Sequence, residues 1–145
     1  FVAQNRGAGR KERIRKGFRR GLMLEACYWV FICIAITLFR RPLMGLFVTA
    51  GNEGIVALGS SYLGLMALFY VFPAFTNGIQ GFFRGMGNMS VTLLGTFVQT
   101  SLRVVFVYLL TPGIGLMGVA YACAIGWSVM LLVEVPYYFW FMKDK

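Results

Sequence analysis

The sequence predicts an all-α membrane protein, a polytopic bundle of four transmembrane helices. Hydrophobic residues make up 59% of the 145 residues, charged residues only 13%, and the mean hydropathy is +0.72. Soluble domains average about 45–50% apolar and about 25% charged residues, so this chain has too little polar surface for a soluble fold. The same composition excludes intrinsic disorder. A bundle of membrane-spanning helices is the class that remains.

A basic, amphipathic segment opens the chain, and we assign residues 1–21 to it. Eight of the 14 Lys and Arg residues lie there, and Glu12 is its single acid. Ile14, Phe18 and Leu22 recur every four residues, which predicts a short helix on the membrane surface, with Glu12 paired to Lys16. The simpler interpretation, which we favour, is a solvated cytoplasmic segment that sets topology. A nucleic-acid-binding arm is disfavoured because no soluble domain accompanies it.

Residues 22–145 form the transmembrane portion. Four apolar segments are predicted to span the bilayer, at residues 22–39, 55–83, 89–110 and 117–142. A spanning helix needs about 20 such residues. Arg40, Arg41 and Pro42 are expected to end the first span. Polar breaks at residues 49–54, 84–88 and 111–115 separate the others, and such short connections predict antiparallel neighbours.

The distribution of Lys and Arg predicts the orientation. With the basic segment inside, Arg84 and the tail carrying Lys143 and Lys145 are inside too. That places 11 basic residues inside and two, Arg40 and Arg41, outside. Because basic residues favour the cytoplasmic side, we expect both ends of the chain in the cytoplasm.

The second span carries a bend signal at Pro73, which we interpret as a hinge. Tyr70, Asn77, Gln80 and Arg84 share its helical face. A proline bend followed by amide side chains fits a moving helix beside a cavity, and we assign Tyr70, Asn77 and Gln80 to a substrate or ion pathway. A static kink satisfied by neighbouring helices is the alternative.

A polar stripe follows the third span, formed by Thr92, Thr96, Gln99 and Arg103, with Thr100 beside it. Such groups are costly to expose to lipid. Two interpretations stay open: Thr96, Gln99 and Arg103 line the pathway, or they are bonded within the bundle, with Arg103 reaching the outer interface.

The fourth span carries a packing signal and an acid. Gly118, Ala122 and Gly126 follow one another at four-residue steps, which predicts close contact with another helix. Glu134, together with Glu25 of the first span, is expected to form interfacial salt bridges, with Arg19, Arg20 or Arg84 as partners.

The composition also limits the chemistry. The chain has no His, so His-dependent catalytic triads and His-ligated metals are excluded. Its three Cys residues form no CxxC pair. We therefore predict no catalytic residue, no metal site and no enzymatic activity.

Three motifs resemble those of the multidrug and toxic compound extrusion (MATE) transporters. The first contains Gln4, Asn5, Gly7 and Ala8, followed by Gly17 in a basic run. The second is the turn with Arg84, Gly85, Gly87 and Asn88, and the third is residues 113–120 at the start of the last span. The resemblance covers essentially the whole chain.

The resemblance implies that this chain corresponds to helices 9–12, about the last third, of a twelve-helix transporter with two lobes. It implies export of drugs or other organic, cationic substrates across a membrane, here the bacterial inner membrane, coupled to Na⁺ or H⁺. The expected partners are the lipid bilayer, the substrate and the remaining helices, with no nucleic acid and no cofactor beyond the coupling ion. The chain would then be a fragment, since it also does not begin with Met.

One departure concerns the second span, which contains no Asp or Glu, unlike members with an acid there. We therefore expect the coupling carboxylate in helices outside this chain, or a substitute polar role for Asn77. Two alternatives for the function remain. One is a related flippase for lipid-linked saccharides, and the other is a small stand-alone four-helix membrane scaffold.

Overall fold

The computed structural model describes residues 1–49 and 51–143, which form six helices. These are α1 (Val2–Gly7), α2 (Lys11–Gly45), α3 (Glu53–Phe69), α4 (Val71–Gly85), α5 (Met89–Ile114) and α6 (Leu116–Lys143). Three of them, α2, α5 and α6, are each long and apolar enough to cross a membrane, and the bent α3–α4 pair supplies a fourth crossing when taken as one span. The predicted all-helical membrane bundle is thereby confirmed.

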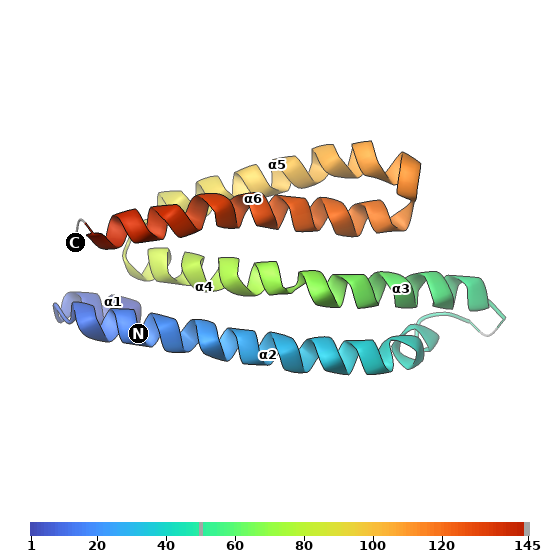
Figure 1. The fold of residues 1–145 in the computed structure, drawn as a ribbon, viewed down its shortest axis with the longest axis horizontal. Helices are drawn as coiled ribbons and strands as arrows, with labels where there is room; N and C mark the ends of the chain where they lie inside the picture. Colours follow the sequence, from blue (N-terminus) through green and yellow to red (C-terminus); the bar gives the residue numbers. More distant parts are fainter. Residues whose placement is uncertain (50, 144–145) are drawn as a thin grey trace.

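The four crossings lie side by side (Figure 1). The α3–α4 pair lies between α2 and α6, and α5 packs along α6. One end of the bundle gathers α1, the start of α2, the α4–α5 turn and the end of α6, and we call it the basic end. The α2–α3 connection and the α5–α6 turn lie at the opposite, far end. The predicted antiparallel order of the spans is therefore observed.

The basic segment and the first span form one continuous helix, α2, with no break between residues 21 and 22. The predicted Glu12–Lys16 pair is present at 2.7 Å, and it lowers the pKa of the Glu12 carboxyl. Ile14 and Phe18 are buried against protein. The amphipathic helix runs into the first span, and its apolar face packs onto α4 and α6 instead of lying free for a membrane surface. At its other end α2 continues through Pro42 to Gly45.

The second span is broken at Tyr70, and α3 and α4 are bent by 40° there. Pro73 explains the position. It has no N–H to donate to the carbonyl four residues earlier, at Phe69, and its ring crowds that carbonyl. Phe69 is the last residue of α3, while Tyr70 still donates to Met66 O at 2.9 Å. The bend predicted from Pro73 thus falls one turn before the proline.

The two remaining turns are tight and depend on glycine. Gly87 has φ +71° between α4 and α5, and Gly115 has φ +60° between α5 and α6. Both values favour glycine because other residues clash there. The predicted break at residues 111–115 was too long. The helix tolerates Pro112 near its end at the loss of one hydrogen bond, so α5 continues to Ile114.

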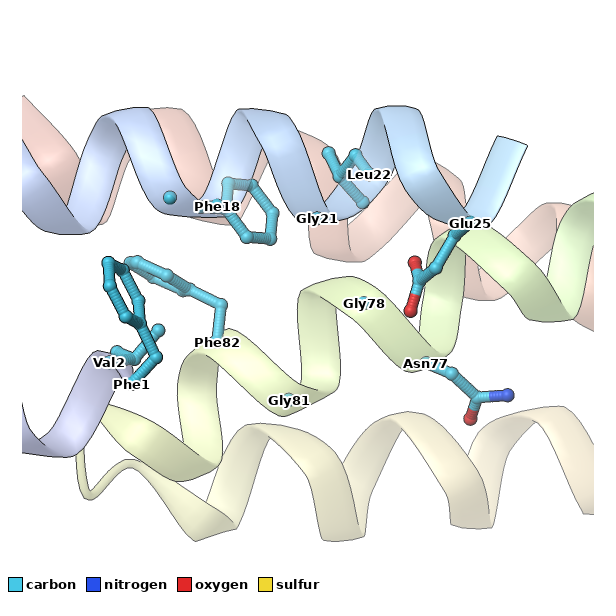
Figure 2. Close-up of a pocket in the computed structure, with 11 residues that line it drawn as sticks. Phe1, Val2, Phe18, Gly21, Leu22, Glu25, Asn77, Gly78, Gly81 and Phe82 are labelled. Carbon is cyan, nitrogen blue, oxygen red and sulfur yellow. The ribbon is translucent and has the colours of Figure 1, made fainter. Parts of the chain in front are cut away.

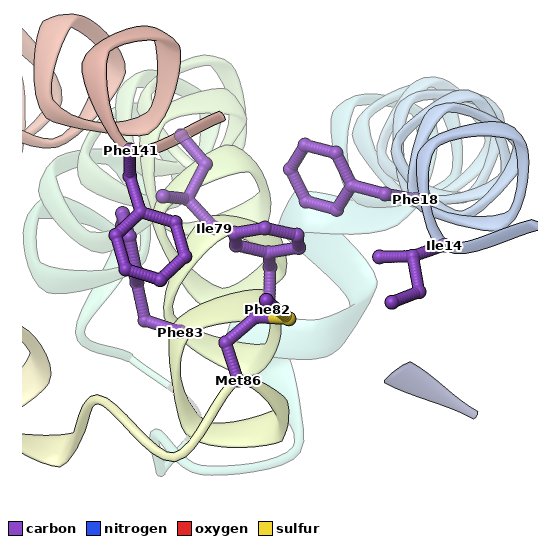
Figure 3. Close-up of a cluster of buried hydrophobic side chains, with 7 residues drawn as sticks. All are labelled: Ile14, Phe18, Ile79, Phe82, Phe83, Met86 and Phe141. Carbon is purple, nitrogen blue, oxygen red and sulfur yellow. The ribbon is translucent and has the colours of Figure 1, made fainter. Parts of the chain in front are cut away.

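The hydrophobic core lies at the basic end (Figure 3). Phe82 of α4 is 1% exposed and lies between Phe18 of α2 and Phe141 of α6, with ring centroids 5.0 and 6.3 Å away. Tyr138 packs on the same ring at 4.9 Å. Edge-to-face aromatic pairs of this kind add to the packing energy, so this cluster fixes α2, α4 and α6 to one another. Its members are Ile14, Phe18, Ile79, Phe82, Phe83, Met86 and Phe141.

Candidate functional site

A groove runs between α2 and α4. It consists of two adjoining hollows of about 400 Å³ each, which share Glu25 and Asn77 in their linings. The hollow toward the far end is also lined by Tyr70 and Pro73. The structure therefore brings together three of the residues predicted for a pathway or hinge, namely Tyr70, Pro73 and Asn77.

Glu25 is the charged residue of this groove. Figure 2 shows its carboxylate extending from α2 toward Gly78 of α4, while the Asn77 amide extends away from it. A Cβ at Gly78 would collide with Glu25 Oε2, so glycine permits this approach. Oε2 is buried and has no hydrogen-bond partner. The predicted salt bridge to Arg19, Arg20 or Arg84 is absent, because the carboxylate points into the bundle rather than toward its end.

Aromatic side chains line the same groove beside Glu25. Tyr28 and Trp29 come from α2 and Tyr70 from the break in the second span. The Trp29 indole donates to Ala67 O at 3.0 Å, which fixes its ring against α3. Tyr28 is 65% exposed. Electron-rich rings near an unpaired carboxylate form an environment that suits a cation with an apolar body.

Gln80 does not line this groove and contacts α6 instead. Its side-chain amide donates to Glu134 Oε1 of α6 at 3.1 Å. Glu134 is 1% exposed, and its Oε2 has no hydrogen-bond partner. The predicted interfacial salt bridges of Glu134 were therefore wrong. The face expected to hold Tyr70, Asn77 and Gln80 together is divided between α2 and α6.

The polar stripe of α5 is also divided. Gln99 is buried against α6, where a Cβ at Gly126 would lie 2.9 Å from its backbone oxygen. Thr96 and Arg103 are exposed on this chain. Only Gln99 of the three proposed pathway residues is enclosed by the described helices, and the pathway role of the stripe stays a prediction.

The family motifs meet at the basic end, although they are far apart in sequence. The Arg6 guanidinium of the first motif donates to Met86 O, within the turn that carries the second. Asn5 is buried and donates to Phe1 O at 2.8 Å, while Gln4 O accepts from Ala8 N at 3.1 Å. These bonds fold the first motif into α1 and attach it to the α4–α5 turn. Gly7 ends α1.

The glycines and Asn88 of the second motif complete this junction. A Cβ at Gly85 would lie 2.6 Å from Val2 Cβ, and one at Gly17 would collide with the Phe1 ring. Asn88 donates to the Tyr137 hydroxyl of α6 at 3.0 Å. Arg84 is exposed. The motif residues therefore hold α1, the α4–α5 turn and α6 together, and do not line the α2–α4 groove, apart from Gly17.

These features define a multi-pass helical membrane protein with a largely apolar groove that holds one carboxylate, beside a broken span. The MatE family model matches residues 1–109, well over half of the chain. The chain therefore belongs to the MatE family, and the resemblance noted from its motifs is confirmed.

One curated relative, the probable multidrug resistance protein NorM of Thermotoga maritima, is 29% identical over 121 residues. The match covers 81% of this chain and 26% of the relative, so the chain spans about a quarter of that protein's length. No solved structure matches the chain.

The Gln80–Glu134 pair is the feature that sequence reasoning missed. A signal was present: two further four-residue steps from Gly118, Ala122 and Gly126 lead to Met130 and Glu134. All five residues are buried in the structure. The contact stripe of α6 thus includes its acid.

Proposed function

We propose that this chain forms part of a secondary active transporter that exports drugs or other organic compounds in exchange for Na⁺ or H⁺. Membership of the MatE family supports transport. The observation that carries the proposal is the α2–α4 groove, in which an unpartnered carboxylate lies beside a bent span. Burying a charge without a partner is costly, so a free carboxylate there favours a cationic ligand.

The substrate class follows from the lining of the groove. Glu25 offers a counter-charge, while Tyr28, Trp29 and Tyr70 offer aromatic surfaces and Ile36 an aliphatic one. An organic cation with a flat, apolar body matches both features. A lipid-linked saccharide needs many hydrogen-bond donors and acceptors instead, and the groove offers few.

Alternating access supplies the mechanism of our proposal. Two lobes rock about a substrate site near the membrane midplane, and the bend at Tyr70 lets α3 move relative to α4. Remaining helices of the full-length protein cover the exposed stripe of Thr96 and Arg103. In the proposed orientation the protein lies in a bacterial inner membrane, with its basic end on the cytoplasmic side.

The test uses the full-length transporter in proteoliposomes, with ethidium as the organic cation. Glu25→Gln removes the charge and keeps the shape, so we expect ethidium binding to weaken about tenfold, the loss of one ion pair. Glu12→Gln is the matched control, because it makes the same change on the same helix at an exposed, Lys16-paired position.

A second variant tests the hinge. Pro73→Ala restores a backbone donor at the break, so we expect slower ethidium transport with unchanged ethidium affinity. If Glu25→Gln binds ethidium as tightly as the unmodified protein at the same protein concentration, the groove is not part of the substrate pathway. Unaltered transport by Pro73→Ala would make the bend a static feature.

A further inference from the structure

Glu134 is enclosed by three helices of this chain. It stands on α6, Gln80 of α4 donates to its Oε1 at 3.1 Å, and a Cβ at Gly95 of α5 would lie 3.0 Å from the same oxygen. Met130 Sδ accepts a weak bond from the same Gln80 amide at 3.9 Å. One carboxyl oxygen is thus hydrogen-bonded, and the other, Oε2, is buried without a partner.

Among residues 1–49 and 51–143, no positive charge compensates this carboxyl. Arg84 on α4 and Arg103 on α5 are both exposed, and neither forms a salt bridge with Glu134 among the described residues. The other titratable side chains near it are Tyr137 and Tyr138 on α6, which are neutral at ordinary pH. Glu25 on α2 lines the groove beyond α4. An ionised carboxylate is costly in such surroundings, whereas a proton on Oε2 removes the charge.

A cavity connects this carboxyl to the basic end. It has a volume of about 340 Å³, lies between α5 and α6, and is lined by Glu134, Gly95 and Val98 at one extremity and by Asn88 and Ser90 near the α4–α5 turn. That volume has room for several water molecules, and the polar groups of Glu134, Asn88 and Ser90 lie along an otherwise apolar lining. The hydroxyl of Tyr137, bonded to Asn88, also borders it. The cavity therefore offers a route along which water could reach Glu134 from the basic end.

We propose that Glu134 and Gln80 form an exchangeable proton-binding site, separate from the substrate groove and reached from the basic end. On binding, water admitted around Glu134 brings a hydronium ion that gives its proton to Oε2 and becomes water, and Gln80 continues to donate to Oε1. On release the proton returns to water, and the charged carboxylate draws water toward itself. This inference rests on the proposed antiport and assigns its coupling ion to H⁺. It places a coupling carboxylate within this chain, in contrast to the expectation from the sequence that this group lies in other helices.

The helix α4 connects this site to the groove. Its Gly78 lies against Glu25 on one side, and its Gln80, two residues on, holds Glu134 on the other. A shift of α4 that admits water around Glu134 must also alter the space beside Glu25. Two sites that bias one movable element are coupled through it, so proton release and cation binding can oppose each other.

The decisive variant is Glu134→Gln in the full-length transporter, because it is nearly isosteric and its amide oxygen still accepts from Gln80. We expect ethidium accumulation driven by a pH gradient to be abolished. Ethidium exchange at equal pH on both sides needs no net proton movement, so we expect it to stay within about twofold of the unmodified protein. Glu12→Gln, which alters an exposed carboxylate, is expected to leave both rates unchanged.

Infrared spectroscopy gives a readout that does not depend on transport. The unmodified protein is expected to show a protonated carboxyl C=O band that disappears on raising pH, and Glu134→Gln is expected to lack it. Gln80→Leu removes the hydrogen bond to Oε1, which should raise the frequency of that band. Both changes identify the carboxyl as that of Glu134.

Three results would overturn the inference. Gradient-driven accumulation that survives Glu134→Gln would exclude this site from coupling. Loss of exchange together with accumulation, in a variant that is folded, would assign Glu134 to substrate binding or structure. An unchanged infrared band would show that Glu134 holds no titrating proton. An unmodified protein that fails to move ethidium but shows the band would refute the transport proposal and leave the proton site standing.

Discussion

The two ends of the bundle are constructed differently. At the basic end, aromatic rings from α2, α4 and α6 enclose Phe82, and the family motifs meet around the α4–α5 turn. At the far end, Leu46 and Phe47 are 79% and 85% exposed, and Pro42 lies within the end of α2. The break at Tyr70 lies between the two ends.

The residues that pack the bundle are thus different from the residues that are proposed to bind ligands. The motif glycines serve close approach, since side chains at Gly17 and Gly85 would collide with Phe1 and Val2. The two carboxylates with unpartnered oxygens, Glu25 and Glu134, lie outside the motifs. The recognisable residues of the family therefore build the fixed end, whereas the groups proposed to bind ligands belong to less distinctive stretches.

The largest expected effect concerns which end faces the cytoplasm. In a cysteine-free full-length protein, a cysteine at Asn52 should react with a membrane-impermeant thiol reagent in intact cells, and one at Arg10 should not. The physical reason is the excess of Lys and Arg at the basic end. Permeabilised cells provide the control, since both sites should then react. Labelling at Arg10 but not Asn52 in intact cells would invert the assignment of the ends.

A core substitution measures how strongly the basic end is packed. Phe82→Ala removes a ring that is 1% exposed and should lower the free energy of unfolding by about 3–5 kcal/mol. Phe47→Ala makes the same change at a far-end residue that is 85% exposed, and its effect should stay within about 0.5 kcal/mol. Denaturant unfolding in detergent compares the two. Equal losses would contradict the contrast between the ends.

A smaller effect tests the turn between α4 and α5. Gly87 has φ +71°, and a side chain there would also collide with Arg6. Gly9 has φ +66°, and a Cβ added there would meet no atom within 4 Å beyond the adjacent residues. The left-handed backbone costs a residue other than glycine about 1–2 kcal/mol, so Gly9→Ala measures that cost alone. Gly87→Ala should lower the free energy of unfolding by more than Gly9→Ala does, because the new side chain forces Arg6 to give up its hydrogen bond to Met86 O. Denaturant unfolding of the two variants measures the difference. Equal losses of unfolding free energy in the two variants would mean that Arg6 can move away without a penalty.

Much of the fold was predictable because composition and hydrophobic runs are local properties. The start of α5 at Met89 and the bend associated with Pro73 both follow from residues near those points. The local pattern wrongly predicted a break at residues 111–115. A proline near a helix end removes only one hydrogen bond, so α5 continues past Pro112 to Ile114.

The site was less predictable because it depends on which helices are neighbours. The repeat of Ile14, Phe18 and Leu22 indicated an apolar face but not whether lipid or protein covers it. Likewise, Gln80 and Asn77 are close in sequence, yet α6 takes one and the α2 groove borders the other. Glu134 was expected to form salt bridges at the interface, whereas its burial depends on contacts with α4 and α5.

The single residue Gly115 has a consequence for how the chain enters a membrane. It is the whole connection between α5 and α6, which pack along each other over their lengths. A one-residue link leaves no slack, so we expect the two helices to insert together as a hairpin. Glu134 then enters the apolar layer beside Gly95 of its companion helix, so the hairpin shields a carboxyl that a lone helix would expose to lipid.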